Sequence, residues 1–126
     1  MKRPNAPRLI DIIEATDAIA AFLEGPKTFQ EFVNNEILHS AVLYKLVIIG
    51  EASAHLSNEL KLKYQAVDWV RIKDFRNYIV HEYWGTALPR VWDSATVDAP
   101  SLRTYCLQIF HLEFPDLVNY LPGANS

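Results

Sequence analysis

The sequence has only one cysteine and no long apolar run, and each scarcity excludes a class of protein. The single Cys106 cannot form a disulfide within the chain, so a disulfide-stapled secreted domain is excluded. Its apolar helical surroundings predict a buried thiol in a reducing compartment. Uninterrupted apolar stretches such as Leu46 to Gly50 fall far short of the ~20 residues that a membrane helix needs. The first residues also lack the pattern of a secretion signal, so we expect a cytoplasmic protein with no membrane segment.

The chain also lacks an excess of positive charge. Its formal net charge of −3 gives no overall basic field that would attract nucleic acid. Any RNA would have to be held by a local patch or by a groove between two copies. A modest basic cluster does occur at Lys61-Leu62-Lys63-Tyr64 with Arg71 and Lys73. These side chains could contact RNA phosphates, or they could form an ordinary solvated surface.

The composition and the hydrophobic pattern indicate one helical domain. Of the 126 residues, 50% are hydrophobic and 21% are charged, which is typical of a single globular unit, here residues 1–126. Apolar residues recur with helical spacing and no useful strand pattern occurs, which predicts an all-α bundle. The expected helices are Arg8 to Glu24, a short helix at the Thr28/Glu31 capping box, one long helix from Glu36 to about Lys63 after a cap at Asn34-Asn35, a helix from the Asp68 cap to Gly85, a helix from Pro89 through Val97, and a last helix from Pro100 to near Tyr120.

Residues suited to phosphate chemistry gather at the end of the helix expected before Gly85. The run from Arg76 to Tyr83 holds an arginine, an asparagine, a histidine and two tyrosines. Arginine binds phosphate through a planar fork of donors, and histidine exchanges a proton near neutral pH. Because the 2′-hydroxyl of RNA supplies the nucleophile, a metal-free ribonuclease needs little beyond these two groups.

The helical period qualifies this interpretation. Asn77 and His81 share a helix face, whereas Arg76 and His81 lie about 140° apart around an ideal helix. The two would meet only if the helix loosens near its end or if long side chains reach into one cleft. The alternative is a structural role, in which Arg76 and His81 cap backbone carbonyls and pair with Asp74 or Glu82.

Glu51 lies in an apolar stretch that should be buried, where an unpaired carboxylate is costly. It therefore needs a partner. The partner could be an ordinary core ion pair or backbone group, or Glu51 could support the site by orienting Arg76 or His81 from the neighbouring helix. Glu51 and His55 also have the spacing of carboxylate and histidine metal ligands, but no second copy of this pattern occurs. We expect neither a metal nor another cofactor.

The motif also resembles a known family. The pattern Arg76-x4-His81-x-Tyr83, with Asn77 directly after the arginine, is similar to the signature of the HepT-like branch of the HEPN (higher eukaryotes and prokaryotes nucleotide-binding) superfamily. Three further segments follow the order and approximate spacing of that branch: Ile48-Ile49-Gly50-Glu51-Ala52, Trp69-Val70-x-Ile72, and Val91-Trp92. The resemblance departs after Tyr83, where Trp84-Gly85-Thr86-Ala87-Leu88-Pro89-Arg90 stands in place of a short acidic stretch.

The resemblance implies a HEPN-type bundle of four main helices with additional short ones, in up-down topology. It implies a homodimer that places the two Arg–His motifs along a cleft between subunits. The activity implied is that of a toxin, a metal-independent endoribonuclease acting on RNA such as tRNA or mRNA, with Arg76, Asn77, His81 and Tyr83 as catalytic residues. The partner implied is a nucleotidyltransferase antitoxin that transfers AMP to Tyr83. Bulk and negative charge added beside Arg76 would fill the phosphate site.

Two other functions remain compatible with the sequence. One is a non-catalytic HEPN subunit that binds nucleotide or regulates a nucleotidyltransferase partner, which predicts a stable complex and no effect on RNA. The other is a simple helical interaction module, which would be favoured if the arginine and the histidine proved solvent-exposed and divergent.

Overall fold

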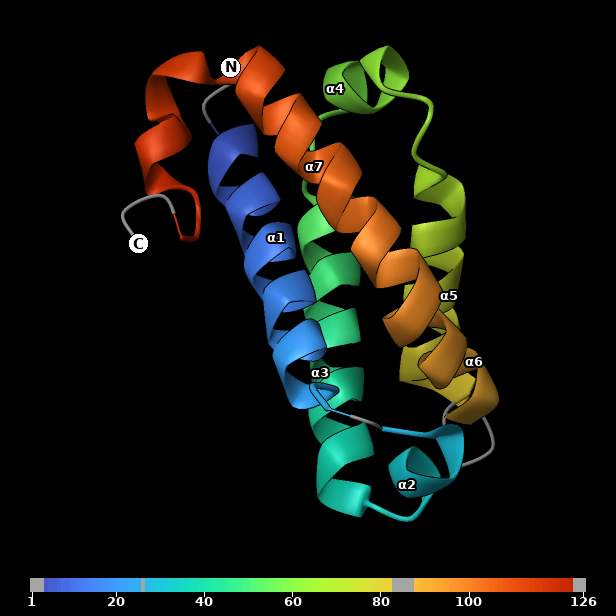
Figure 1. Cartoon of the computed structure of the whole chain (residues 1–126). Helices are drawn as coiled ribbons and strands as arrows, with labels where there is room; N and C mark the ends of the chain where they lie inside the picture. The colour runs from blue at the N-terminus through green and yellow to red at the C-terminus, as the bar shows by residue number, and fades with distance from the viewer. Residues whose placement is uncertain (1–3, 26, 83–87, 124–126) are drawn as a thin grey trace.

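Four long helices run alternately up and down in the computed structural model, which describes residues 4–25, 27–82 and 88–123, with the backbone alone for 80–82. They are α1 (Asn5–Phe22), α3 (Glu36–Ala54), α5 (Trp69–Glu82) and α7 (Ala99–Glu113). In Figure 1, α3 lies between α1 and α5, and α7 crosses the bundle diagonally. The described part of the chain contains no strand. The expected all-α bundle with up-down topology is confirmed.

Short helical elements connect the long ones. They are α2 (Phe29–Val33), α4 (Asn58–Lys63), α6 (Leu88–Asp93), a π-helical turn at Ser94–Asp98 and a 3-10 helix at Pro115–Tyr120.

Local capping signals in the sequence were correct. The Thr28 hydroxyl accepts a hydrogen bond from the Glu31 N–H at 3.1 Å, and the Glu31 carboxylate accepts one from the Thr28 N–H at 3.1 Å. Asn35 caps α3 at the Leu38 N–H, and Asp68 accepts from the Arg71 N–H, each at 3.0 Å. These short-range bonds satisfy N–H groups that have no partner within the helix, so they fix where each helix begins.

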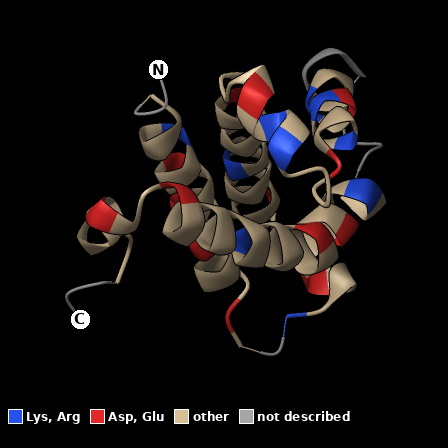
Figure 2. Ribbon diagram, turned by 90° about the horizontal axis from the view of Figure 1, so that it is seen from above, with Lys and Arg blue, Asp and Glu red and all other residues tan. Residues whose placement is uncertain are grey.

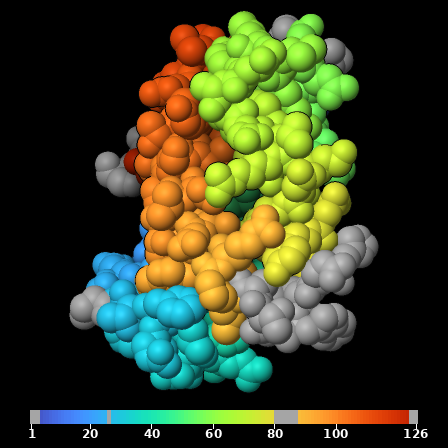
Figure 3. Space-filling model, turned by 90° about the vertical axis from the view of Figure 1, so that its right-hand side faces the viewer, coloured from blue at the N-terminus to red at the C-terminus, as the bar shows by residue number. Residues whose placement is uncertain are grey.

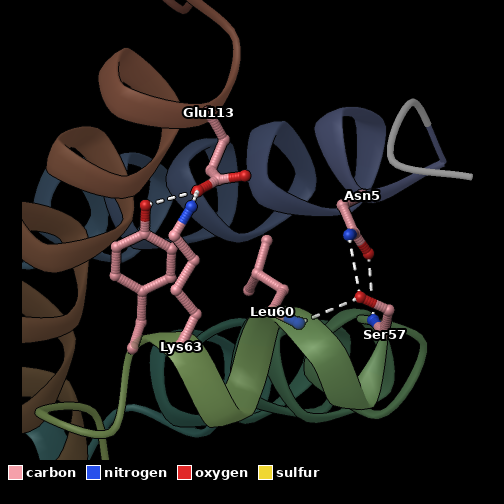
Figure 4. A network of polar contacts seen from close by, with 6 residues as sticks. Asn5, Ser57, Leu60, Lys63 and Glu113 are labelled. Atoms are coloured by element: carbon pink, nitrogen blue, oxygen red, sulfur yellow. Dashed lines mark hydrogen bonds and ion pairs between the residues drawn. The ribbon is translucent and has the colours of Figure 1, made fainter.

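The single long helix expected from Glu36 to Lys63 is wrong, because the chain leaves the helical conformation at Ser57. Ser57 is extended (φ −65°, ψ 150°), and its hydroxyl accepts a hydrogen bond from the Leu60 N–H to start α4. Asn5, buried at the start of α1, holds Ser57 by accepting from its N–H at 2.9 Å and donating to its hydroxyl at 3.0 Å (Figure 4). The break is thus stabilised by a residue far away in the sequence.

The last two helices also differ from expectation. Pro89 and Pro100 do lie in first turns, but the α-helix expected through Val97 gives way to the π-helical turn after Asp93. The helix expected to run to Tyr120 ends as α-helix at Glu113. Pro115 follows closely, and proline disfavours helical backbone at the residue before it and donates no hydrogen bond.

We expect Asn5→Ala to lower the free energy of unfolding by about 1–3 kcal/mol, because it leaves the Ser57 N–H without its acceptor in a part-buried position. Urea unfolding followed by circular dichroism measures this change. The matched control is Asn58→Ala, at an exposed position of α4, which should change the free energy by no more than about 0.5 kcal/mol. Equal effects of the two substitutions would contradict the role given to Asn5.

A second contact ties α4 to the end of α7. The Tyr64 hydroxyl donates to the Glu113 carboxylate at 2.5 Å, and Lys63 pairs with the same oxygen at 2.7 Å (Figure 4). Burial and the Glu113 carboxylate raise the pKa of Tyr64 to about 12, so its hydroxyl stays protonated and remains a donor. The short helix is therefore fixed at both of its ends.

The hydrophobic core runs along the inward faces of the long helices. Cys106 is fully buried there, and burial raises the pKa of its thiol to about 12, so the expected buried thiol is confirmed. On the surface, Arg103 of α7 pairs with Asp17 of α1. The largest fully buried side chains are Leu9, Ile12, Ile13, Ile19, Phe32, Val42, Val91 and Phe110.

Helix α3 is more apolar than its longest uninterrupted run suggests. By length and composition alone it could cross a membrane, since an 18-residue window of the helix has a mean hydropathy of 1.4. Within the bundle, 33% of this window is buried. In this fold α3 is instead the core helix between α1 and α5. Its outward face leaves apolar side chains uncovered, above all Ile37 (84% exposed) and Tyr44 (63% exposed).

Candidate active site

The candidate site begins where α3 and α5 cross most closely, at Gly50 and Arg76. A Cβ added to Gly50 would lie 2.4 Å from the Cβ and 2.5 Å from the Cγ of Arg76, which real contacts essentially never allow. Only the missing side chain of glycine lets the Arg76 stem lie directly on the backbone of α3. The close approach brings the arginine beside Glu51, the residue that follows Gly50.

The guanidinium of Arg76 is held on two sides. Its Nε donates to Glu51 Oε1 at 2.8 Å, and its Nη2 lies 2.6 Å from the same oxygen. Its Nη1 donates to Oδ1 of Asn77 at 3.0 Å. Because arginine has five N–H donors, these three contacts orient the group, and contacts among the described residues leave two donors for a ligand.

The structure corrects the burial expected for Glu51. Its side chain is 44% exposed, and that of Arg76 is 29% exposed, so their ion pair lies at the surface. The contact joins a carboxylate on one helix to an arginine on the next, as the supporting arrangement considered for Glu51 requires, and the supporting role itself stays a prediction. The purely structural role considered for Arg76 paired it with Asp74 or Glu82. Arg76 makes no ion pair with Asp74, and the side chain of Glu82 falls outside the described residues.

The ring of His55 contacts the backbone of Glu51. Its Nδ1 lies 2.8 Å from the backbone carbonyl oxygen of Glu51, four residues earlier, so the ring satisfies the end of α3. Within the described ranges no group of three or more His, Cys, Asp or Glu side chains lies close enough to hold a metal ion.

The other two motif residues are only partly visible. The backbone of His81 lies in the last turn of α5, which ends at Glu82, while its side chain and all of Tyr83 fall outside the described residues. On a regular helix His81 follows Asn77 by one turn and lies on the same face. The roles expected for His81 and Tyr83 therefore stay predictions.

Exposed apolar side chains share helix faces with the Glu51, Arg76 and Asn77 cluster. The helical period places Tyr44, Ile48 and Glu51 on the outward face of α3. On α5, Val70 is 69% exposed and precedes Asn77 by seven residues, on the same face. In a single copy the polar cluster is thus a shallow surface feature bordered by uncovered apolar side chains.

A hollow of the described surface lies elsewhere. It has a volume of about 260 Å³ and lies between α5, the π-helical turn and α7, on the side of α5 turned away from Asn77 (Figure 3). Apolar side chains such as Ile72 and Leu102 line it, and Arg71 and Asp98 pair at 3.4 Å beside it. A deep cleft formed by one chain is therefore not what defines the candidate site.

The sequence reasoning missed two contacts of α5, one at the candidate site and one on the side of the hollow. Gly50 was noticed only as part of a motif, although its lack of a side chain sets the helix crossing. Arg90 of α6 was not considered, yet its guanidinium lies 4.4 Å from the ring centre of Tyr78 and 5.2 Å from that of Phe75. Both roles depend on distant segments, so no local pattern could have identified them.

Comparisons with known proteins identify the family of the chain. The family model described as "Ribonuclease HepT-like" matches residues 12–109. A Thermococcus cleftensis protein named as a probable ribonuclease HepT is 32% identical over 82% of this chain and 93% of its own length. Two Methanocaldococcus jannaschii proteins are both named provisionally as RNases. One is 31% identical over 81% of this chain and 93% of its own length. The other is 29% identical over 99% of this chain and 96% of its own length. No solved structure matches the chain significantly. The chain belongs to the HepT-like ribonuclease family.

Proposed function

We propose that this chain is a metal-independent endoribonuclease that acts as the toxin of a toxin–antitoxin pair. The observation that carries the proposal is the arginine clamped by Glu51 and Asn77 with two N–H donors still free, in a chain of the HepT-like family. An oriented, partly exposed guanidinium is suited to the negative charge of a phosphodiester.

The proposed reaction uses the 2′-hydroxyl of RNA as its nucleophile. A base removes the hydroxyl proton, the 2′-oxygen forms a bond to phosphorus, and the bond from phosphorus to the 5′-oxygen breaks as that oxygen takes up a proton. The products are a 2′,3′-cyclic phosphate and a 5′-hydroxyl. Arg76 stabilises the charge that builds on the phosphoryl oxygens, Asn77 orients the substrate, His81 acts as acid or base, and Tyr83 supports them.

A second copy of the chain is the proposed cover of the apolar face. Ile37 and Tyr44 of α3 and Val70 of α5 are exposed on the side that carries Glu51 and Asn77. Exposed large apolar side chains on one face of a bundle are typical of an association site. A homodimer across this face would place two motifs beside each other and would turn two shallow sites into one groove wide enough for RNA.

The proposed antitoxin is a nucleotidyltransferase that transfers AMP to Tyr83. Support comes from the family and from the charge of the site, since a phosphate ester attached seven residues after Arg76 would compete with RNA for the two free donors of that arginine. The modification would thereby block the site and leave the fold intact.

The experiment is induced expression of the wild-type chain and of His81→Ala, with growth and total RNA followed together. We expect growth arrest and new RNA fragments from the wild type alone, with a loss of roughly 100-fold or more in cleavage rate for the variant. Circular dichroism of the purified variant serves as the folding control. If the folded variant cuts RNA as fast as the wild type, His81 is not the acid or base.

The alternative is a non-catalytic subunit that regulates a nucleotidyltransferase. The pairing of Arg76 with Glu51 favours this alternative, because the carboxylate neutralises the cation that would face phosphate. It predicts a stable complex with the transferase and no RNA fragments from the wild type. The same expression experiment separates the two proposals.

A further inference from the structure

Of the basic residues that cluster around α4 and the start of α5, two have charges that nearby acids do not offset. Lys63 pairs with Glu113 at 2.7 Å, and Arg71 pairs with Asp98 at 3.4 Å. No carboxylate within the described ranges makes an ion pair with Lys61 or Lys73. The structure thus separates the cluster into neutralised and available charges.

The two remaining lysines are brought together by the connection between their helices. The indole N–H of Trp69, at the start of α5, donates to the backbone carbonyl of Tyr64, just after α4, at 3.1 Å. This bond holds the last turn of α4, which carries Lys61, close to the first turns of α5, which carry Lys73. Figure 2 shows basic positions of α4 and α5 beside each other at this end of the bundle.

The pKa of Lys61 reflects its proximity to Lys73. Burial and the positive charge of Lys73 both lower the pKa of Lys61. Two like charges held near each other repel, and an anion placed between them would relieve the repulsion. The pair is therefore arranged for an anionic group that no ion pair among the described residues supplies.

Lys73 also lies on the same side of α5 as the candidate active site. It precedes Arg76 by three residues and Asn77 by four, spacings that put these side chains next to one another on a helix surface. One turn of helix, about 5.4 Å along the axis, separates them. A chain of phosphates that places one group at Arg76 can therefore place a neighbouring group at Lys73.

We propose that Lys61 and Lys73 form a second phosphate-binding position that holds the RNA backbone next to the scissile phosphate. The proposal rests on the ribonuclease function proposed above. The two lysines are positioning residues, since they bind a phosphate that does not react. They give an acidic chain a local means of holding RNA, and they fix the direction in which the strand leaves the site towards α4.

The test compares Lys61→Gln/Lys73→Gln with the control Lys27→Gln/Arg71→Gln, which removes the same charge from an exposed lysine and from an arginine of α5 that pairs with Asp98. The probe is a short fluorescein-labelled single-stranded RNA that the wild type cleaves. We expect KM to rise about tenfold in the first variant while kcat stays within about twofold, because a contact to a distant phosphate affects binding more than chemistry. The control should match the wild type.

A second readout separates phosphate binding from a general structural effect. The slope of log binding constant against log salt should fall by about 0.7 for each phosphate of a single strand that the protein no longer neutralises, hence by roughly 0.7 in the double variant, which loses one phosphate position. Binding is measured in a His81→Ala background to prevent cleavage. Lys61→Arg/Lys73→Arg keeps both charges and should restore KM and the slope.

The failures of the two proposals are distinguishable. If the wild type cleaves RNA and the double glutamine variant keeps the wild-type KM and salt slope, the second phosphate position is wrong and the ribonuclease function stands. If KM rises equally in the control variant, the effect belongs to net charge, and the proposal is again overturned. If the wild type cuts no RNA in cells or in solution, the proposed function falls, and the lysine position falls with it.

Discussion

Gly50→Ala is expected to remove RNA cleavage, although the substitution adds a single methyl group on the side of α3 that faces α5. The new carbon would lie 2.4 Å from the Cβ of Arg76. That atom is bonded directly to the backbone of α5, so a change of side-chain rotamer cannot move it away. The two helices would have to separate, at a cost of about 1–3 kcal/mol for overpacking. Their separation pulls the Arg76 guanidinium from Glu51, so the site loses its orientation as well as its support. Thermal unfolding and the RNA-fragment assay measure the two effects.

Gly25→Ala is the matched control for that prediction. Gly25 has a φ of 88°, a conformation that residues with side chains rarely adopt, and an added Cβ would meet nothing within 4 Å. Its replacement should cost roughly 1 kcal/mol through backbone strain alone. We expect this variant to lose stability and still cut RNA. Equal cleavage by Gly50→Ala and Gly25→Ala would show that the crossing does not position Arg76.

The second large effect is expected from Arg76→Gln, which should reduce the rate of RNA cleavage by about 100- to 1,000-fold through the loss of charge stabilisation at the phosphate. The fold should survive, because the ion pair with Glu51 is partly exposed and such pairs contribute about 0–1 kcal/mol. Single-turnover cleavage and urea unfolding together measure the two quantities. A large loss of stability would instead favour the structural role considered for this arginine.

Arg71→Gln provides the control for Arg76→Gln. Arg71 lies on the same helix, is exposed, and pairs with Asp98 beside the hollow on the other side of α5. Its loss should leave the cleavage rate near that of the wild type. Arg76→Lys should retain only part of the activity, because one ammonium cannot hold Glu51, Asn77 and a phosphate in the fixed directions of a guanidinium.

The parts of the fold that the sequence predicted correctly depend on neighbours along the chain. The caps at Thr28, Asn35 and Asp68 each join groups three residues apart, so their signals are local. The break at Ser57 was missed because its stabilising partner, Asn5, is 52 residues away. The apolar periodicity continues across the break, so the sequence pattern does not indicate that the helix ends there.

The candidate site divides in the same way. The chemistry of Arg76 and Asn77 could be inferred from residue type, and the pairing of Glu51 with Arg76 was one of two arrangements considered. The exposure of Glu51 was wrongly predicted, because an apolar stretch on α3 need not be buried when the helix has an uncovered face. The crossing at Gly50 required the packing of two helices, which no single segment encodes.

The uncovered face of α3 also makes activity a matter of dosage. If two copies must associate to bring their motifs together, the amount of paired protein in dilute solution rises with the square of chain concentration. A few chains in a cell would then remain mostly single and inactive, whereas a modest increase in synthesis would produce a steep increase in RNA damage. The apolar side chains left open by one copy would thus act as a threshold on expression, in addition to any control by an antitoxin.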